Sequence, residues 1–189
     1  MSKRIIQKPF PALYPVPVML ITSLDSDGEP NVFTVSWVGT VSSSPPQVAI
    51  GVRPHRYSRA AIQQTGEFVI NVPDESLLRA VDICGHVSKA RADKFALTGL
   101  TPVPASQVRA PLVAECPVNI ECQVVQTLSL DSHDLFVGKI VALHVDEALL
   151  DDTGFIDYSR TQPVVYLGNE YWSLGRRLGT SGFSRREGE

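Results

Sequence analysis

The chain has 189 residues, of which 43% are hydrophobic and 20% are charged, and its mean hydropathy is +0.03. This composition excludes an intrinsically disordered chain, and the length suffices for one core without disulfide or metal supports. The net charge of −3 excludes a general positive field, so we expect no nucleic-acid partner and no membrane partner, although a local basic patch remains compatible with this balance.

The cysteines, prolines and glycines bear on compartment and architecture. Cys84, Cys116 and Cys122 lack C-x-x-C spacing, so we expect reduced thiols and a cytoplasmic protein. Prolines between residues 9 and 17 interrupt the N-terminal apolar stretch, which argues against a signal peptide, and no stretch approaches the roughly 20 apolar residues of a membrane helix. The 14 prolines and 13 glycines predict many short elements joined by sharp turns.

The first half of the chain predicts short strands interrupted by helices. Residues 18–22 and 31–38 are rich in β-branched and aromatic residues and flank a turn at 25–28, which is typical of a hairpin. The other elements expected in this half are a strand over 48–52, a helix from an N-cap at Ser58 to Gly66, a strand over 67–72, a helix from Asp74 to Gly85, and a short helix from Asp93 to Gly99.

The second half predicts more strands. Two long strands, 118–127 and 135–145, have the pattern of hairpin partners, and 163–167 is also strand-like. We expect one domain over 1–175 and a mobile tail over 176–189, where no periodicity is visible. Because strands outnumber helices and do not alternate with them, the sequence predicts a mainly β fold, an antiparallel barrel or sandwich rather than a doubly wound parallel sheet.

Several site chemistries lack their sequence signatures. The glycines form neither the G-x-G-x-x-G dinucleotide fingerprint nor a P-loop, so any nucleotide must be held in another way. The histidines show no H-E-x-x-H spacing, and we expect no metal site. No G-x-S-x-G elbow indicates a hydrolase.

A cluster of hydroxyl and guanidinium groups lies between residues 31 and 58. Thr34 and Ser36 share one strand face, and Arg53 and Arg56 precede the helix expected at Ser58. Hydroxyls, guanidinium groups and the free N–H groups of a first helical turn together suit a phosphate. An alternative stays open: the hydroxyl residues serve only as strand and helix-cap residues, and the two arginines are only solvated.

An ordered series of motifs resembles a known family. The motifs lie at residues 14–18, 21–23, 30–31, 34–37, 45–46, 66–72, 93–95 and 135–138. Together they are similar to the flavin reductase-like, FMN-binding split-barrel family, and within it to flavoredoxin-type members. The resemblance extends from about Tyr14 to Trp172. It implies a Greek-key split β-barrel with a few short helices that forms a homodimer and binds FMN near the subunit interface.

The resemblance also implies which residues hold FMN. The implied contacts are Thr34, Ser36, Trp37 and Ser42 at the flavin and its ribityl chain, Arg53, Arg56, Tyr57 and Ser58 at the phosphate, Asn71 at the end of a strand beside the site, and Lys94. Two of the implied residues are catalytic candidates. His133 would face the ring, and Lys94, if near the N1 and O2 edge, would favour the anionic reduced flavin.

For several side chains a plain structural role is the alternative. His133 lies in a polar turn, where a solvated loop residue is the simpler reading. Cys84 suits core packing better than a redox thiol, and Trp37, like Trp172, suits the core or an interface on composition alone.

The implied activity is that of an FMN-binding oxidoreductase, either an NAD(P)H:flavin reductase or an electron carrier fed by a redox protein. The alternative is a non-catalytic barrel that binds a flavin or another small ligand as an interaction module. Residues 88–89 (Ser-Lys) and Lys139 depart from the pattern of many members, so contacts made there by substrate or partner stay open. The sequence does not distinguish NADH from NADPH.

Overall fold

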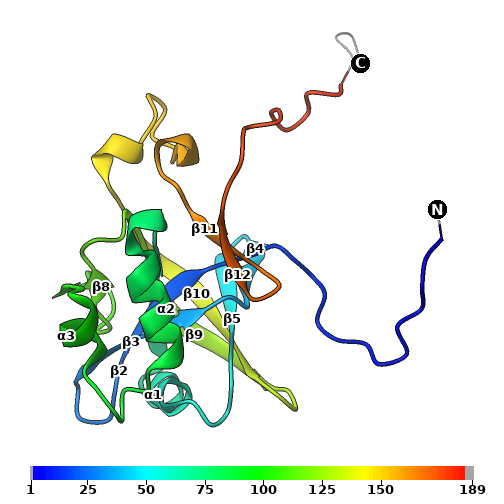
Figure 1. Ribbon diagram of the computed structural model, residues 1–189. Coiled ribbons are helices and arrows are strands. Elements are labelled where there is room, and N and C mark those ends of the chain that lie inside the picture. The colour runs from blue at the N-terminus through cyan, green and yellow to red at the C-terminus, as the bar shows by residue number, and fades with distance from the viewer. Residues whose placement is uncertain (1, 186–189) are drawn as a thin grey trace.

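Antiparallel strands dominate the computed structural model, which describes residues 2–185 (Figure 1). The strands are β1 (Val16–Pro17), β2 (Met19–Leu24), β3 (Pro30–Val35), β4 (Val38–Ser43), β5 (Pro46–Val52), β6 (Glu67–Val72), β7 (Pro102–Val103), β8 (Leu112–Val113), β9 (Val118–Ser129), β10 (Asp134–Val145), β11 (Val164–Leu167) and β12 (Glu170–Ser173). The helices are α1 (Tyr57–Thr65), α2 (Leu78–His86) and α3 (Lys94–Thr98), with 3-10 turns η1 (Glu75–Leu77), η2 (Glu147–Leu149) and η3 (Tyr158–Arg160). The mainly β fold predicted from the sequence is confirmed.

Seven strands form one antiparallel sheet in the order β3-β2-β6-β9-β10-β5-β4. Its two edge strands, β3 and β4, are consecutive in the chain and are joined only by Ser36 and Trp37. The sheet must therefore curl until its opposite edges approach each other, which makes it a barrel split at this connection. The N–H of Gly51 donates to the Trp37 carbonyl at 2.8 Å and ties the connection to β5.

This connection corrects one sequence prediction. The strand expected over 31–38 ends at Val35, and the chain then crosses to the opposite edge and starts β4, which the sequence analysis did not separate. The physical reason is that alternation of side chains reports which face a residue takes, and it does not report which neighbouring strand supplies its hydrogen bonds.

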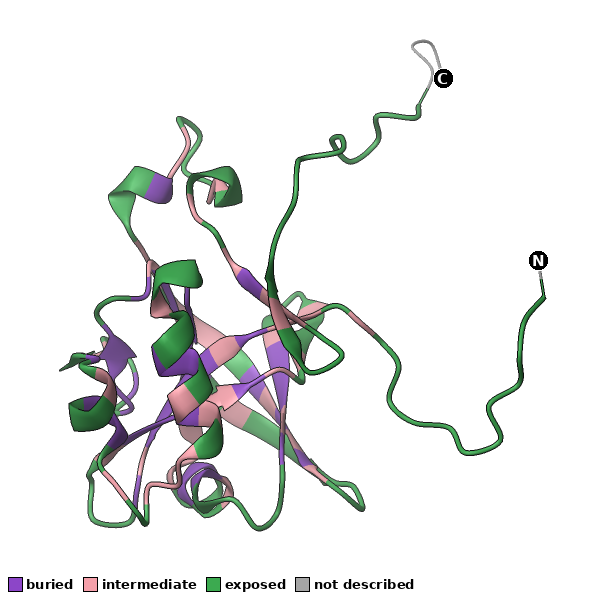
Figure 2. Cartoon of the chain, in the orientation of Figure 1, coloured by how far each residue is buried: buried purple, intermediate pink, exposed green. Residues whose placement is uncertain are grey.

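The barrel interior is filled by apolar side chains from opposite strands. Ile21 and Phe33 point inward from the first hairpin and pack with Ile50, Phe68 and Phe136. Alternate residues of the same hairpin, such as Leu20 and Val32, point outward and are covered by α2 and α3. Figure 2 shows the resulting buried residues along the central strands and along the sheet-facing sides of α1 and α2.

Helix boundaries follow the predicted stop signals more closely than the predicted starts. Gly66 ends α1 in the left-handed conformation with φ of 69°. Asp74 caps the 3-10 turn that leads into α2, but α2 continues past Gly85 to His86 because a glycine can also adopt helical angles. The prediction that Ser58 is an N-cap is wrong: the cap position is Arg56, without a side-chain cap, and Ser58 lies within the first turn.

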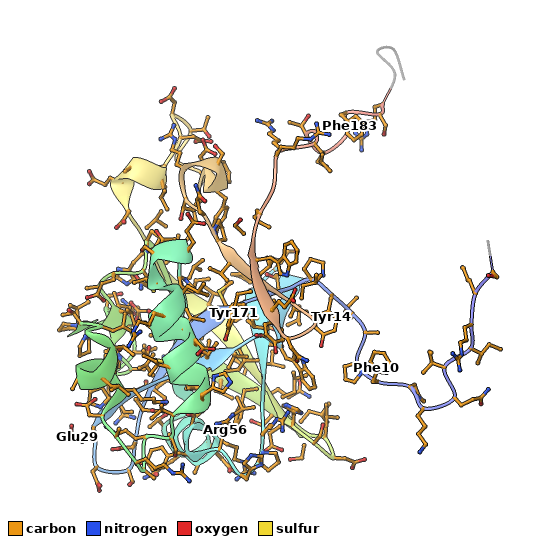
Figure 3. The ribbon with its side chains drawn as sticks, viewed as in Figure 1. Phe10, Tyr14, Glu29, Arg56, Tyr171 and Phe183 are labelled. Carbon is orange, nitrogen blue, oxygen red and sulfur yellow. The ribbon has the colours of Figure 1, made fainter. Side chains whose placement is uncertain are left out.

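The long hairpin is confirmed, with β9 and β10 pairing antiparallel from Val118 and Val145 onward. A second, three-stranded sheet has the order β1-β11-β12. Beyond it both terminal segments extend away from the body, and Phe10 and Phe183 lie far out on them (Figure 3). Residues 186–189 of the tail expected to be mobile lie outside the described residues.

No helix within 2–185 has both the length and the apolar composition needed to cross a membrane. In the same part of the chain, no group of three or more His, Cys, Asp or Glu side chains is placed to hold a metal ion.

Gly138 on β10 generates a prediction about the barrel. A Cβ at this position would lie 2.7 Å from Cζ of Phe68, so Gly138→Ala should lower the free energy of unfolding by about 1–3 kcal/mol through overpacking. Chemical denaturation would measure this. Gly39→Ala is the matched control, since its Cβ meets nothing within 4 Å, and equal effects of the two substitutions would contradict the prediction.

Candidate functional site

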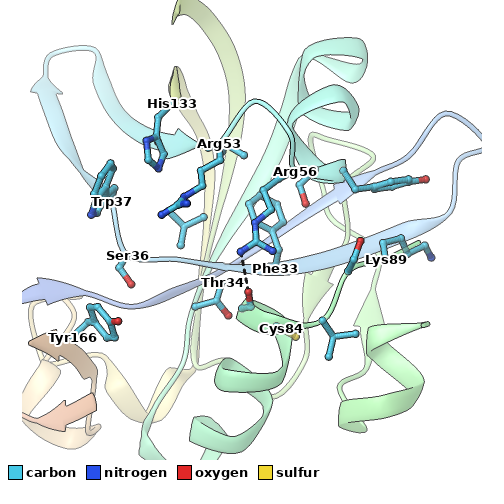
Figure 4. Close-up of a pocket in the computed structure, with 18 of the residues that line it drawn as sticks. Phe33, Thr34, Ser36, Trp37, Arg53, Arg56, Cys84, Lys89, His133 and Tyr166 are labelled. Carbon is cyan, nitrogen blue, oxygen red and sulfur yellow. Dashed lines mark hydrogen bonds between the residues drawn. The ribbon is translucent and has the colours of Figure 1, made fainter. Parts of the chain in front are cut away.

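A cavity of about 300 Å³ lies where β3 passes into β4. Its walls come from the β3–β4 connection, the segment between β5 and α1, the end of α2 with the following loop, the start of α3, and the tip of the β9–β10 hairpin. Figure 4 shows side chains from these segments, distant in the sequence, pointing into one space. The volume is at the lower end of the range for small-molecule sites.

Most of the residues that the sequence predicted for a cofactor site line this cavity. They are Thr34, Ser36, Trp37, Arg53, Arg56, Tyr57, Ser58, Lys94 and His133. The structure thus brings together residues that span a hundred positions of the chain. Their roles toward a cofactor stay predictions.

Two of the predicted residues do not line the cavity. Ser42 lies on β4 beside Gln47, away from the cavity. Asn71 is fully buried in the body of the sheet, where its Nδ2 donates to the Leu20 carbonyl at 3.1 Å and its Oδ1 accepts from Val113 N at 2.9 Å. Because both ends of this amide are engaged with the protein, Asn71 is corrected here from a cofactor contact to a cross-link between strands.

The cavity is strongly cationic although the chain carries net negative charge. Four basic side chains, Arg53, Arg56, Lys89 and Lys94, line it, and none of its described lining residues is a carboxylate. Arg56 donates to the carbonyl of Gly85 at 3.3 Å, as the dashed line in Figure 4 marks. Such a concentration of positive charge in the wall of one cavity indicates an anionic ligand.

Lys94 is the most constrained of these cations. It is 3% exposed at the start of α3, it lines the cavity, and its ammonium group has no hydrogen bond or ion pair within residues 2–185. Burial, reinforced by the charges of Arg56 and Lys89, lowers the pKa of Lys94 to about 8. The neighbouring Cys84 also lines the cavity, and burial raises the pKa of its thiol to about 11, so the thiol is neutral.

The first turn of α1 adds neutral donors to the cationic side chains. The backbone N–H groups of Tyr57 and Ser58 have no carbonyl four residues back within the helix, and both residues line the cavity. The positive end of the helix dipole lies at the same place. Together with Arg53 and Arg56 these groups make a site suited to a phosphate.

The opposite end of the cavity is aromatic. The rings of Trp37 and His133 have centroids 4.1 Å apart and planes inclined by 39°, and Tyr166 lines the same end (Figure 4). Burial and the nearby charges of Arg53 and His55 lower the pKa of His133, which favours its neutral form. Trp37 is 44% exposed, so it is no core residue, and a flat ring system has exposed aromatic surface to lie against.

Sequence reasoning missed several lining residues, among them Tyr166, Asn169 and Lys89. The signal for the first two was present. Residues 168–169 are Gly-Asn between two apolar runs, a pair typical of a two-residue hairpin turn, and Asn169 has φ of 84°. The Tyr166 hydroxyl donates to Oδ1 of Asn169 at 3.1 Å across this turn.

The comparisons with known proteins bear on this site. A family model described as "flavin reductase like domain" matches residues 12–175. The chain belongs to the flavin reductase-like family. A relative from Archaeoglobus fulgidus is 36% identical over 146 residues, which cover 77% of this chain and 81% of that one.

Solved structures agree with the flavin reductase-like assignment. Flavoredoxin of Desulfovibrio vulgaris (Miyazaki F) is 33% identical, has a TM-score of 0.90 and matches 98% of this chain and 100% of its own. Flavoredoxin from Methanosarcina acetivorans is 29% identical with a TM-score of 0.86, and 97% of each chain is covered. These findings confirm the resemblance seen in the sequence and the split-barrel fold, and they support a flavin as the cofactor.

The residues of this flavin reductase-like chain fit that cofactor. FMN combines a phosphate dianion with a flat tricyclic ring, and the cavity combines four basic side chains with exposed aromatic faces. The decisive observation is Lys94, a buried residue in the cavity wall whose ammonium group has no hydrogen bond or ion pair within residues 2–185, because a desolvated charge is unfavourable unless a ligand supplies its partner.

Lys94 generates a prediction for the protein without ligand. Between about pH 8 and pH 10.5 the unfolded chain keeps the Lys94 proton while the folded protein has released it, so stability gains with rising pH. The free energy of unfolding of wild type should therefore rise relative to Lys94→Met across this window. Urea denaturation at several pH values would measure the difference, and parallel curves for the two proteins would contradict the prediction.

Proposed function

We propose that this protein is an FMN-dependent oxidoreductase that takes electrons from NAD(P)H or from a redox protein and passes them through the flavin to an acceptor. The observation that carries the proposal is one cavity with a cationic end and an aromatic end, in a chain of the flavin reductase-like family. Membership of this family supports flavin-linked redox chemistry in general.

The two ends of the cavity divide the work of binding. Arg53, Arg56 and the first turn of α1 would hold the phosphate, and Ser36 and Thr34 lie between that end and the aromatic one. The Thr34 hydroxyl donates to the Val81 carbonyl at 2.5 Å, so toward a ligand it is an acceptor. Trp37 would border the ring, which, when bound, supplies the hydride and single-electron chemistry.

Lys94 and His133 are the candidate catalytic residues. Lys94 would place a positive charge near the flavin, which stabilises negative charge that appears on reduction. His133, in its neutral form, can accept a proton at the aromatic end, and its Nδ1 lies 2.9 Å from the Ser132 hydroxyl. Both roles are parts of the proposal.

A homodimer is also part of the proposal. The terminal segments carry large apolar side chains that the body does not cover, among them Phe10, Leu13, Leu178 and Phe183, which are 67% to 86% exposed. Exposed apolar side chains concentrated on extended segments support burial against a second copy of the chain.

The visible spectrum tests the proposed function. Purified protein, or protein supplied with FMN, should show bound flavin absorbance, and NADH or NADPH should bleach it under anaerobic conditions. If neither nucleotide reduces the bound flavin but a reduced carrier protein does, the electron donor is a redox protein. If nothing reduces the bound flavin, the protein is a non-catalytic flavin-binding barrel. Protein that does not bind FMN would contradict the proposal.

The role of Lys94 generates a separate prediction. Lys94→Met should lower the two-electron reduction potential of the bound flavin by about 30 mV or more, since 30 mV corresponds to roughly 1.4 kcal/mol for such a couple. Equilibration with a reference dye measures it. Lys139→Met, an exposed lysine that does not line the cavity, is the control, and an unchanged potential in Lys94→Met would remove Lys94 from this role.

A further inference from the structure

Asn31 is a buried residue next to the cationic end of the cavity that does not itself line the cavity. It lies on β3, is 1% exposed, and donates through Nδ2 to Oγ of Ser58 at 3.0 Å. Its Oδ1 is buried without a hydrogen-bond partner among the described residues. Buried polar atoms without partners are rare in folded proteins, which indicates that this amide is retained for its contact with Ser58.

The contact with Asn31 determines what the Ser58 hydroxyl can do. Ser58 is 4% exposed and lines the cavity. Since its Oγ already accepts a hydrogen bond from Asn31, its own O–H is available to donate, and within residues 2–185 it donates to no other group. The hydroxyl is therefore a neutral donor at the start of α1, beside the backbone N–H groups of the first turn.

The same end of the β2–β3 hairpin makes two further contacts with residues that line the cationic end of the cavity. Oδ2 of Asp25 accepts from the Tyr57 hydroxyl at 3.0 Å, and the Pro30 carbonyl accepts from Nζ of Lys89 at 3.0 Å. The hairpin thus contacts two consecutive residues of α1 and one cation of the loop after α2. Asn31 supplies the contact to the Ser58 hydroxyl, which lines the cavity.

We infer that Asn31 is a positioning residue for the phosphate of FMN, because it directs the proton of Ser58 toward a phosphate oxygen. The inference rests on the proposed function, since it takes the anion in the cavity to be FMN. It goes beyond that function by assigning phosphate recognition to a residue outside the cavity wall. Asn31 acts on the phosphate alone, so its removal should distinguish flavins that have a phosphate from those that lack one.

Titration of the flavin-free full chain with FMN and with riboflavin tests the inference, because riboflavin lacks the phosphate. Asn31→Leu, which has a similar branched shape, should weaken FMN binding about 10-fold, the effect of one hydrogen bond to a charged group, and leave riboflavin binding unchanged. Ser58→Ala should do the same. The double variant should bind FMN no more weakly than either single variant, since both remove one interaction.

Ser23→Ala is the matched control. Ser23 pairs directly with Asn31 across the hairpin, is buried with an unpaired Oγ, and does not line the cavity, so its removal disturbs the same hairpin without affecting either flavin. If thermal denaturation shows that Asn31→Leu does not fold, Asn31→Ala takes its place in the same cycle.

Two results would overturn the inference while the proposed function stands. One is equal loss of FMN and riboflavin affinity in Asn31→Leu, which would make Asn31 a packing residue. The other is a double variant whose fold loss of FMN affinity equals the product of the two single losses, which would make Asn31 and Ser58 independent. Failure of wild type to bind either flavin would overturn the proposed function itself, together with the inference.

Discussion

The two-residue connection between β3 and β4 brings the opposite edges of a seven-stranded sheet together, and the site depends on this closure. Apolar side chains such as Phe68 and Phe136 fill the interior and provide the driving force for curling the sheet. Gly138 permits the closest of these contacts. The connection itself carries Ser36 and Trp37 into the cavity, so the residues that close the barrel also line the site.

The cavity concentrates positive charge at a cost to the folded protein without ligand. Arg53, Arg56, Lys89 and Lys94 converge without a carboxylate among the described lining residues, and Lys94 is buried as well. Mutual repulsion and desolvation both disfavour this arrangement. The anionic cofactor that we propose would supply counter-charge for these groups, which is consistent with a fold organised for its loaded state.

Rigid supports hold the flexible cations in this arrangement. Arg56 is tied to the end of α2, and Lys89 and Ser58 are tied to the β2–β3 hairpin through backbone or amide groups. Such supports limit the rotamers that the binding side chains must give up when a ligand arrives. They also explain why a residue outside the cavity wall, Asn31, bears on recognition within it.

The sequence by itself determined the mainly β class, the long β9–β10 hairpin and nine of the residues that line the cavity, because alternation, turn residues and ordered motifs are local properties of the chain. It did not determine that Val35 ends one edge of the sheet, that Asn71 is engaged within the sheet, or that Tyr166 and Asn169 reach the cavity. Those facts depend on which distant strands pair and which side chains face one another after closure. Only the tertiary structure decides such contacts, because no local pattern encodes the partner of a hydrogen bond.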